Sequence, residues 1–195
     1  MRKDKLVRKT KETNIEIEFN LDGAGKGSIR TPVPFLNHML ELFTRHGLFD
    51  MKLKASGDTE TDDHHTVEDV GICLGAVIKK TLGDKRGISR YGCSTLPMDE
   101  TLSEVCIDIS GRPYFVFNVK FGKSYRQDDF DFALIEDFFR AVSFNAGLTL
   151  HVNLKYGKNN HHIAESVFKG FAKALAEAVV VNTRVKTIPS TKGTL

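Results

Sequence analysis

His64-His65-Thr66-Val67-Glu68 and His161-His162-Ile163-Ala164-Glu165 are two copies of one five-residue pattern, and together they decide the fold. Each copy joins two adjacent histidines to a glutamate that follows the second histidine by three residues. The copies begin 97 residues apart in a chain of 195 residues, so each half of the chain carries one. A repeat of this length indicates an internal duplication.

The same order of predicted elements surrounds both copies. Apolar residues at helical spacing predict helices over 35–45 and 132–146, and strands follow at 49–55 and 148–155. A polar loop then leads into a helix that begins with the histidine pair. The first of these helices runs to Gly83, and the second runs from His161 to about 182. When the two helices that precede these strands are aligned in sequence, His38 and Asp137 fall at equivalent positions of the repeat.

Alternating apolar residues predict further strands over 15–21, 88–95, 104–110 and 114–121. The predicted fold class is α+β, with two similar halves and a β-sheet layer packed against a helical layer. No Pro-, Gly- or Ser-rich linker separates the halves, so residues 1–195 should form one compact domain. We place the repeats at about 8–97 and 98–187, followed by a substrate-binding tail at 188–195.

Composition excludes several classes of protein. The net charge is only +3, and basic and acidic residues are interspersed, which gives no argument for nucleic acid binding. The basic N-terminus has no apolar segment behind it, and no apolar run is long enough to span a bilayer. Three cysteines without C-x-x-C spacing argue against a disulfide framework and a thiolate zinc site. We therefore expect a cytoplasmic protein without a membrane partner.

The two histidine motifs predict metal binding. Imidazole and carboxylate groups are common ligands of Mn, Fe, Ni and Zn, and a helix places residues three and four apart on one face. Adjacent histidines point about 100° apart around a helix, which suits two different ions better than one. Two motifs can therefore supply two sites, one using the first histidines and the other the second. A single His-His pair at a helix start is commonly only a solvated surface feature. Because four of the seven histidines fall in two copies of one pattern, metal binding is favoured over that interpretation.

Other polar residues are candidate contacts for an anion. Arg90, Arg112 and Lys169 are basic, and the tail over 188–193 offers hydroxyls and an ammonium group. Taken singly, each is more commonly a solvated charge. By the same standard Glu12 is an ordinary surface carboxylate, and His46 caps a helix end, where the dipole favours a cation.

Five segments together resemble those of the imidazoleglycerol-phosphate dehydratase family, whose members act in histidine biosynthesis. The resemblance runs in the same order from about Arg8 to the C-terminus, and it is carried by Phe35-Leu36-Asn37-His38-Met39-Leu40, the segment 62–69, Gly111-Arg112-Pro113, the second His-His-x-x-Glu motif, and Pro189-Ser190-Thr191-Lys192-Gly193. Such a set is far more specific than any single motif.

The resemblance implies two Mn²⁺ ions per active site. One ion is assigned His64, His161, Glu165 and position 137, and the other is assigned His38, His65, Glu68 and His162. This agrees with the split expected from helix geometry. The chain departs from some members at Asp137, where they carry histidine. Asp can still bind manganese, directly or through water.

The resemblance also implies a substrate site lined by Glu12, His46, Arg90, Arg112, Lys169, Ser190, Thr191 and Lys192, with the basic residues on a phosphate. Family members form closed homo-oligomers of cubic symmetry, with about two dozen subunits and active sites between them, so a 24-mer is expected.

The implied reaction converts D-erythro-imidazoleglycerol phosphate to imidazoleacetol phosphate. No carbonyl acidifies the C–H bond, so two metals at the ring nitrogens are expected to stabilise an imidazolate that expels the hydroxyl and leaves a diazafulvene. A base then removes a proton from the next carbon. Glu12 is the candidate for this acid/base role.

Two alternatives remain open. A non-catalytic metal-binding or metal-sensing module would use the same histidines but not the Arg and Lys residues. A metal-dependent phosphate-ester hydrolase would share the ligand chemistry and release free phosphate.

Overall fold

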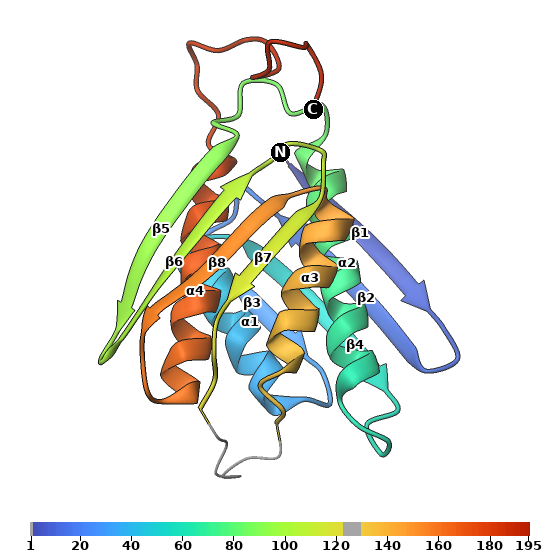
Figure 1. The fold of residues 1–195 in the computed structure, drawn as a ribbon. Helices are drawn as coiled ribbons and strands as arrows, with labels where there is room; N and C mark the ends of the chain where they lie inside the picture. The colour runs from blue at the N-terminus through green and yellow to red at the C-terminus, as the bar shows by residue number, and fades with distance from the viewer. Residues whose placement is uncertain (1, 123–129) are drawn as a thin grey trace.

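The computed structural model describes residues 2–122 and 130–195, which form two similar halves (Figure 1). The first half contains β1 (Lys3–Lys9), β2 (Thr13–Asn20), β3 (Gly27–Arg30), α1 (Pro34–Gly47), β4 (Asp50–Gly57) and α2 (His64–Leu82). The second contains β5 (Tyr91–Met98), β6 (Thr101–Asp108), β7 (Tyr114–Asn118), α3 (Leu134–Ala146), β8 (Thr149–Tyr156) and α4 (Asn160–Ala178).

Each half builds one four-stranded sheet with the same topology. The strand orders are β1-β2-β4-β3 and β5-β6-β8-β7. In both sheets the last pair, β3 with β4 and β7 with β8, is parallel, and the other pairs are antiparallel. The prediction of an α+β fold with two similar halves is confirmed.

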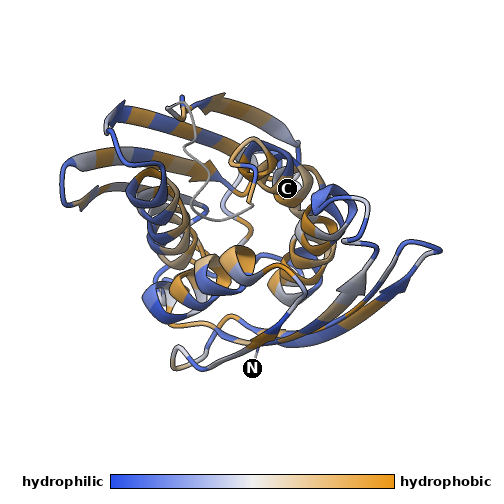
Figure 2. Cartoon of the chain, turned by 90° about the horizontal axis from the view of Figure 1, so that it is seen from below, coloured by the Kyte–Doolittle hydropathy of each residue, from blue (hydrophilic) through white to orange (hydrophobic). Residues whose placement is uncertain are grey.

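The four helices lie between the two sheets (Figure 2). In the first half α2 packs on β2 and β1, and in the second α4 packs on β5 and β6. The contacts between helices cross between the halves, because α1 packs against α4 and α2 against α3. The helical layer is therefore shared, with one sheet on each side of it.

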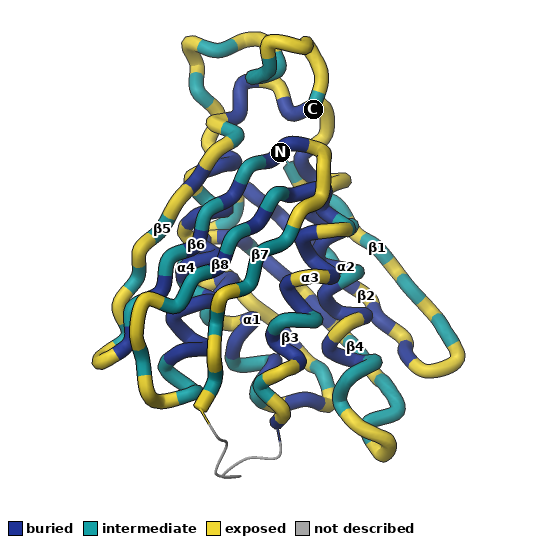
Figure 3. Tube along the Cα trace, in the orientation of Figure 1, coloured by how far each residue is buried: buried dark blue, intermediate teal, exposed yellow. Residues whose placement is uncertain are grey.

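The core forms between these layers because the strands alternate in burial (Figure 3). On β2, Ile15, Ile17 and Phe19 are buried and point toward the helices, whereas Asn14 and Glu16 are exposed. Burial of such side chains stabilises each by about 1.5–3 kcal/mol relative to exposure. One continuous apolar cluster joins both sheets to the helices.

The two helix pairs that cross between the halves pack differently. A Cβ atom at Gly71 would lie 2.7 Å from the carbonyl oxygen of Phe138, and one at Gly75 would lie 2.6 Å from that of Val142. Glycine is therefore required for the close approach of α2 and α3. The α1/α4 pair is instead filled by aromatic rings, with Phe43 stacked on Phe171 at 5.5 Å.

The structure corrects three expectations about individual elements. It adds the strands β1 and β3, which the sequence did not predict because one is rich in charge and the other spans only four residues. The last helix ends at Ala178 and not near 182, because Val181 pairs with Ile88 in an isolated bridge.

No helix in the described part of the chain is long and apolar enough to cross a membrane.

Candidate metal centre and anion site

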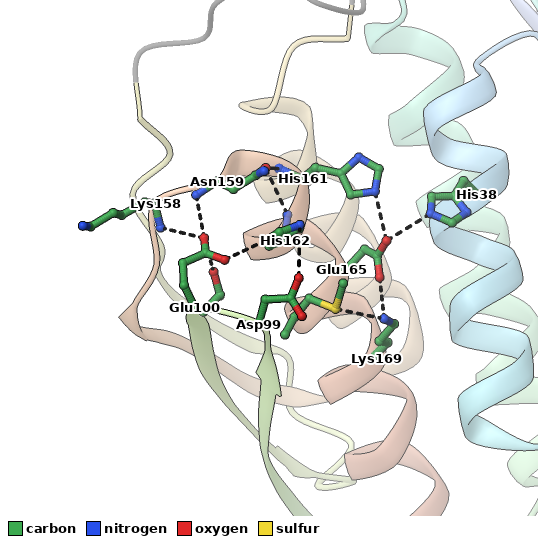
Figure 4. Close-up of polar contacts among 11 residues, drawn as sticks. His38, Asp99, Glu100, Lys158, Asn159, His161, His162, Glu165 and Lys169 are labelled. Atoms are coloured by element: carbon green, nitrogen blue, oxygen red, sulfur yellow. Dashed lines mark hydrogen bonds and ion pairs between the residues drawn. The ribbon is translucent and has the colours of Figure 1, made fainter.

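The first turns of α1 and α4 bring three potential metal ligands together. Nε2 of His38 lies 3.2 Å from Oε1 of Glu165, and Nε2 of His161 lies 2.9 Å from the same oxygen (Figure 4). One ligand atom from each residue falls within 4.8 Å of the other two. The histidine side chains are 44% exposed, whereas that of Glu165 is 9% exposed. The cluster thus joins a buried carboxylate to two accessible imidazoles.

The equivalent positions of the other helix pair form a looser group. Nε2 of His64 lies 3.9 Å from Oε2 of Glu68, and its Nδ1 lies 4.0 Å from Oδ2 of Asp137. Here α2 supplies the motif and α3 supplies the facing residue. Each motif therefore faces the helix of the opposite half, with histidine at one position and aspartate at the other.

The second histidine of each pair is held by a carboxylate from a loop. Nδ1 of His65 lies 3.1 Å from Oδ2 of Asp58, and Nδ1 of His162 lies 2.7 Å from Oε2 of Glu100. The hydrogen bond with Asp58 raises the pKa of His65. The hydrogen bond with His162 is the main cause that lowers the pKa of Glu100 to about 2. In both cases Nε2 faces away from this contact.

Lys169 completes the electrostatic environment of Glu165. Its ammonium group donates to Oε2 of Glu165 from one turn further along α4. Burial alone would raise the pKa of Glu165, but the hydrogen bonds from Lys169, His38 and His161 outweigh it and lower the pKa to about 2. His46 lies near Lys169 at the end of α1, where burial followed by the charge of Lys169 lowers its pKa.

Glu12 stands in the turn between β1 and β2. Its side chain is exposed and makes no hydrogen bond or ion pair with any described residue, while its backbone N–H donates to Thr10. The negative charge of Glu12 is also one of the causes that raise the pKa of His65. The charge of Glu12 therefore acts on the second histidine of the first motif, and its carboxylate has no hydrogen bond or ion pair among the described residues.

The other predicted substrate contacts gather at the C-terminal ends of the helices. The backbone N–H of Arg90 donates to Ala178 at the end of α4, and that of Gly111, next to Arg112, donates to Gly147 after α3. Arg90 also reaches the C-terminal tail, because its Nη1 donates to the carbonyl oxygen of Pro189 at 2.9 Å. Ser190, Thr191 and Lys192 follow directly. This end is opposite to the histidines at the helix starts (Figure 1).

Asp108 forms an ion pair with the guanidinium group of Arg90. It accepts from Nε at 2.7 Å and from Nη2 at 3.1 Å, and these hydrogen bonds raise the pKa of Arg90. Arg112 is held near its own loop, since its backbone N–H donates to Oγ of Ser110. Oγ of Ser190 accepts from the backbone N–H of Lys192 at 3.2 Å. Lys192 itself is exposed.

The grouping within one chain differs from the two sets implied by the family resemblance. His38 lies with His161 and Glu165, and His64 lies with Glu68 and Asp137. The implied four-ligand sets mix members of these two groups and add the second histidines. Within a single chain each group therefore supplies only part of either implied set.

The donor set fits a divalent metal ion. Two imidazole nitrogens and a carboxylate oxygen within 4.8 Å of one another match the spacing around an ion bound at about 2.0–2.2 Å, and these donors suit manganese, iron or zinc. The site has no thiolate. The three positions are also fixed on helices, which limits rearrangement on binding.

Asp58 and Glu100 are two residues of this region that the sequence did not single out. Asp58 follows the end of β4, and Glu100 lies in the turn between β5 and β6. A useful signal was available for Glu100, because it precedes Thr101 at the start of β6 as Glu12 precedes Thr13 at the start of β2.

Comparisons with known proteins identify the family of the chain. The family model described as imidazoleglycerol-phosphate dehydratase matches residues 31–175. The protein of that name from Syntrophus aciditrophicus is 55% identical over 195 residues, covering 100% of this chain and 99% of its own, and that from Clostridium botulinum is 56% identical over 191 residues, covering 98% and 97%.

Solved structures show the same fold. The imidazoleglycerol-phosphate dehydratase from Staphylococcus aureus is 41% identical, with a TM-score of 0.82 over 92% of this chain and 99% of its own. The enzyme from Pyrococcus furiosus, solved in complex with (S)-C348, is 34% identical, with a TM-score of 0.84 over 97% and 100%. The chain therefore belongs to the imidazoleglycerol-phosphate dehydratase family.

Proposed function

We propose that the chain dehydrates D-erythro-imidazoleglycerol phosphate to imidazoleacetol phosphate in histidine biosynthesis, using two Mn²⁺ ions per active site. The observation that carries the proposal is the convergence of His38 and His161 on one oxygen of Glu165. A looser group formed by His64, Glu68 and Asp137 occupies the equivalent place in the other half. Family membership supports the choice of reaction.

Eight side chains are proposed to hold the ions: His38, His64, His65, Glu68, Asp137, His161, His162 and Glu165. When bound at the ring nitrogens of the substrate, the ions would stabilise negative charge on the imidazole and so favour loss of the hydroxyl from the adjoining carbon. Lys169 donates to Glu165 and balances its negative charge.

Glu12 is proposed to carry the proton chemistry. The reaction removes a hydroxide from the carbon attached to the ring and a proton from the next carbon, and the resulting enol becomes a ketone. An exposed carboxylate without a partner among the described residues is available to take this proton or to protonate the leaving hydroxyl. Its electrostatic influence on His65 supports the assignment.

The phosphate is proposed to bind Arg90, Arg112, Lys169 and the segment Ser190-Thr191-Lys192, with His46 nearby. Apart from Lys169 and His46, these residues lie at one end of the folded molecule, and the first turns of the helices lie at the other. A second copy is then needed to place them beside the metal ligands. This separation supports assembly into a closed homo-oligomer, which we propose to be the 24-mer. We also propose that it works in the cytoplasm.

The test is conversion of imidazoleglycerol phosphate by metal-stripped protein before and after Mn²⁺ is returned. We expect imidazoleacetol phosphate only with the metal and no release of inorganic phosphate. His161→Ala should abolish conversion, whereas His151→Ala, a histidine on β8 outside both motifs, should not. Free phosphate in place of the ketone would support a hydrolase, and tight Mn²⁺ binding without any product would support a non-catalytic module.

A further inference from the structure

Glu100 lies in the two-residue turn between β5 and β6, beside the start of α4. Its Oε1 accepts hydrogen bonds from the backbone N–H groups of Asn159 at 2.9 Å and Lys158 at 3.3 Å (Figure 4). The hydroxyl of Thr101 donates to the same oxygen at 3.2 Å. Three donors on one oxygen fix the plane of the carboxylate. They also tie the turn to the loop that precedes α4.

The second oxygen of Glu100 is then directed at His162, 2.7 Å from its Nδ1. A carboxylate can only accept, so Nδ1 must carry the proton in this contact. A neutral imidazole with the proton on Nδ1 has its lone pair on Nε2. That nitrogen is 3.8 Å from the carboxylate of Asp99, beyond hydrogen-bonding distance, and so remains available.

The first half reaches the same result with a different carboxylate. Asp58 follows Gly57 after β4 and contacts Nδ1 of His65. In the second half Lys158 follows Gly157 at the equivalent position and offers only its N–H, to Glu100. Both halves therefore hold the same nitrogen of the second histidine, although the supporting residue comes from different loops. An incidental contact would not be expected to recur in this way.

We propose that Glu100 is a positioning residue, which holds His162 with its proton on Nδ1 and so presents Nε2 to a divalent metal ion. The inference rests on the proposed function only in that it requires metal binding. Partners of this kind fix the tautomer and orientation of ligand histidines, and their loss typically weakens metal affinity by about 10–100-fold.

The test compares Glu100→Gln with Glu104→Gln, a matched change on β6 where the carboxylate contacts Lys155 at the surface. The metal-free oligomers are titrated with Mn²⁺, and unbound ion is measured by electron paramagnetic resonance. In Glu100→Gln one carboxylate oxygen is replaced by an NH₂ group, which donates and cannot accept. It faces either the two backbone N–H donors or the protonated Nδ1, so one of these contacts is lost. We expect about 10–100-fold weaker binding of one of two ions. Glu104→Gln should bind as the wild type does.

Asn160→Ala separates positioning from general damage to the loop, since it removes the two hydrogen bonds that tie the start of α4 to Gly122 but keeps the contacts of Glu100. It should lower the thermal midpoint and leave Mn²⁺ affinity unchanged. The inference is overturned if Asn160→Ala weakens binding as much as Glu100→Gln, or if Glu100→Gln binds both ions normally. Failure of the wild type to bind Mn²⁺ would overturn both this inference and the proposed function.

Discussion

The two halves share their strand order and the positions of their histidine pairs, yet they differ at the residues around those pairs. His38 on α1 corresponds to Asp137 on α3, and both face the motif of the opposite half. Asp58, which holds His65, corresponds to Lys158. Glu12, which is uncommitted, corresponds to Glu100, which holds His162.

This comparison separates what is fixed by helices from what is fixed by loops. The histidine pairs lie in the first turn of a helix in both halves, and a helix start defines where its side chains lie. A hydrogen bond to the second histidine can be supplied by any nearby loop, and the two halves use different ones. Since the second half uses its turn glutamate for support, Glu12 is the turn glutamate that we propose for acid/base work.

The largest expected effect tests whether the two motifs are equivalent in function. Glu165→Gln and Glu68→Gln should each lower kcat by on the order of 10⁴-fold, because metal stabilisation of several kcal/mol is lost and each 1.4 kcal/mol is tenfold. Conversion of imidazoleglycerol phosphate measures this, with Glu16→Gln on the outer face of β2 as the control. Near-normal turnover by Glu68→Gln alone would show that only the tighter cluster matters.

Glu12→Gln tests the division of roles between the two turn glutamates. We expect kcat to fall by about 10³-fold, within the range for lost acid/base catalysis, while Mn²⁺ affinity stays as in the wild type. In Glu100→Gln we expect Mn²⁺ affinity to be the quantity that is mainly affected, and it should fall. Parallel measurement of kcat and Mn²⁺ affinity on both variants checks this. Normal turnover by Glu12→Gln would remove its proposed role.

Substitution of Asp137 tests the histidine-to-aspartate difference between the facing helices. Asp137→Asn should weaken binding of one Mn²⁺ ion by about 10–100-fold, because an uncharged amide is a poorer ligand than a carboxylate. Asp137→His should bind close to normally, since histidine occupies the equivalent position 38. Titration with Mn²⁺ distinguishes the two. Unchanged affinity in Asp137→Asn would argue against direct coordination.

Much of this comparison could be predicted from the sequence, because it depends on local periodicity. The histidine pairs begin helices as expected. Alignment of the preceding helices correctly gave His38 and Asp137 equivalent positions in the two halves. The edge strands β1 and β3 were missed. Their residues are charged or few, so they lack the apolar alternation that marks a strand with one buried face.

The contacts around the motifs could not be read from the sequence. His38 lies with His161 because α1 crosses to the other half and packs on α4, and such packing depends on side-chain fit between distant helices. The roles of Asp58 and Glu100 depend on where two loops point relative to the helix starts. Loop direction has no periodic signal, so Asp58 resembles an ordinary surface acid in the sequence, and only its equivalence to Glu12 in the repeat distinguishes Glu100.

The smallest expected effect concerns the helix pairs themselves. Gly71→Ala should lower the free energy of unfolding by about 1–3 kcal/mol, because its methyl group would meet the carbonyl oxygen of Phe138 and force α3 away from α2. The α1/α4 pair has Phe43 and Phe171 at its contact and should be unaffected. Thermal unfolding of the metal-free protein measures the loss, with the exposed Lys79→Ala on α2 as the control. If the variant is as stable as that control, close glycine packing does not set the distance between α2 and α3. If it is less stable and also binds one Mn²⁺ ion more weakly, the spacing of these helices positions Asp137 against His64.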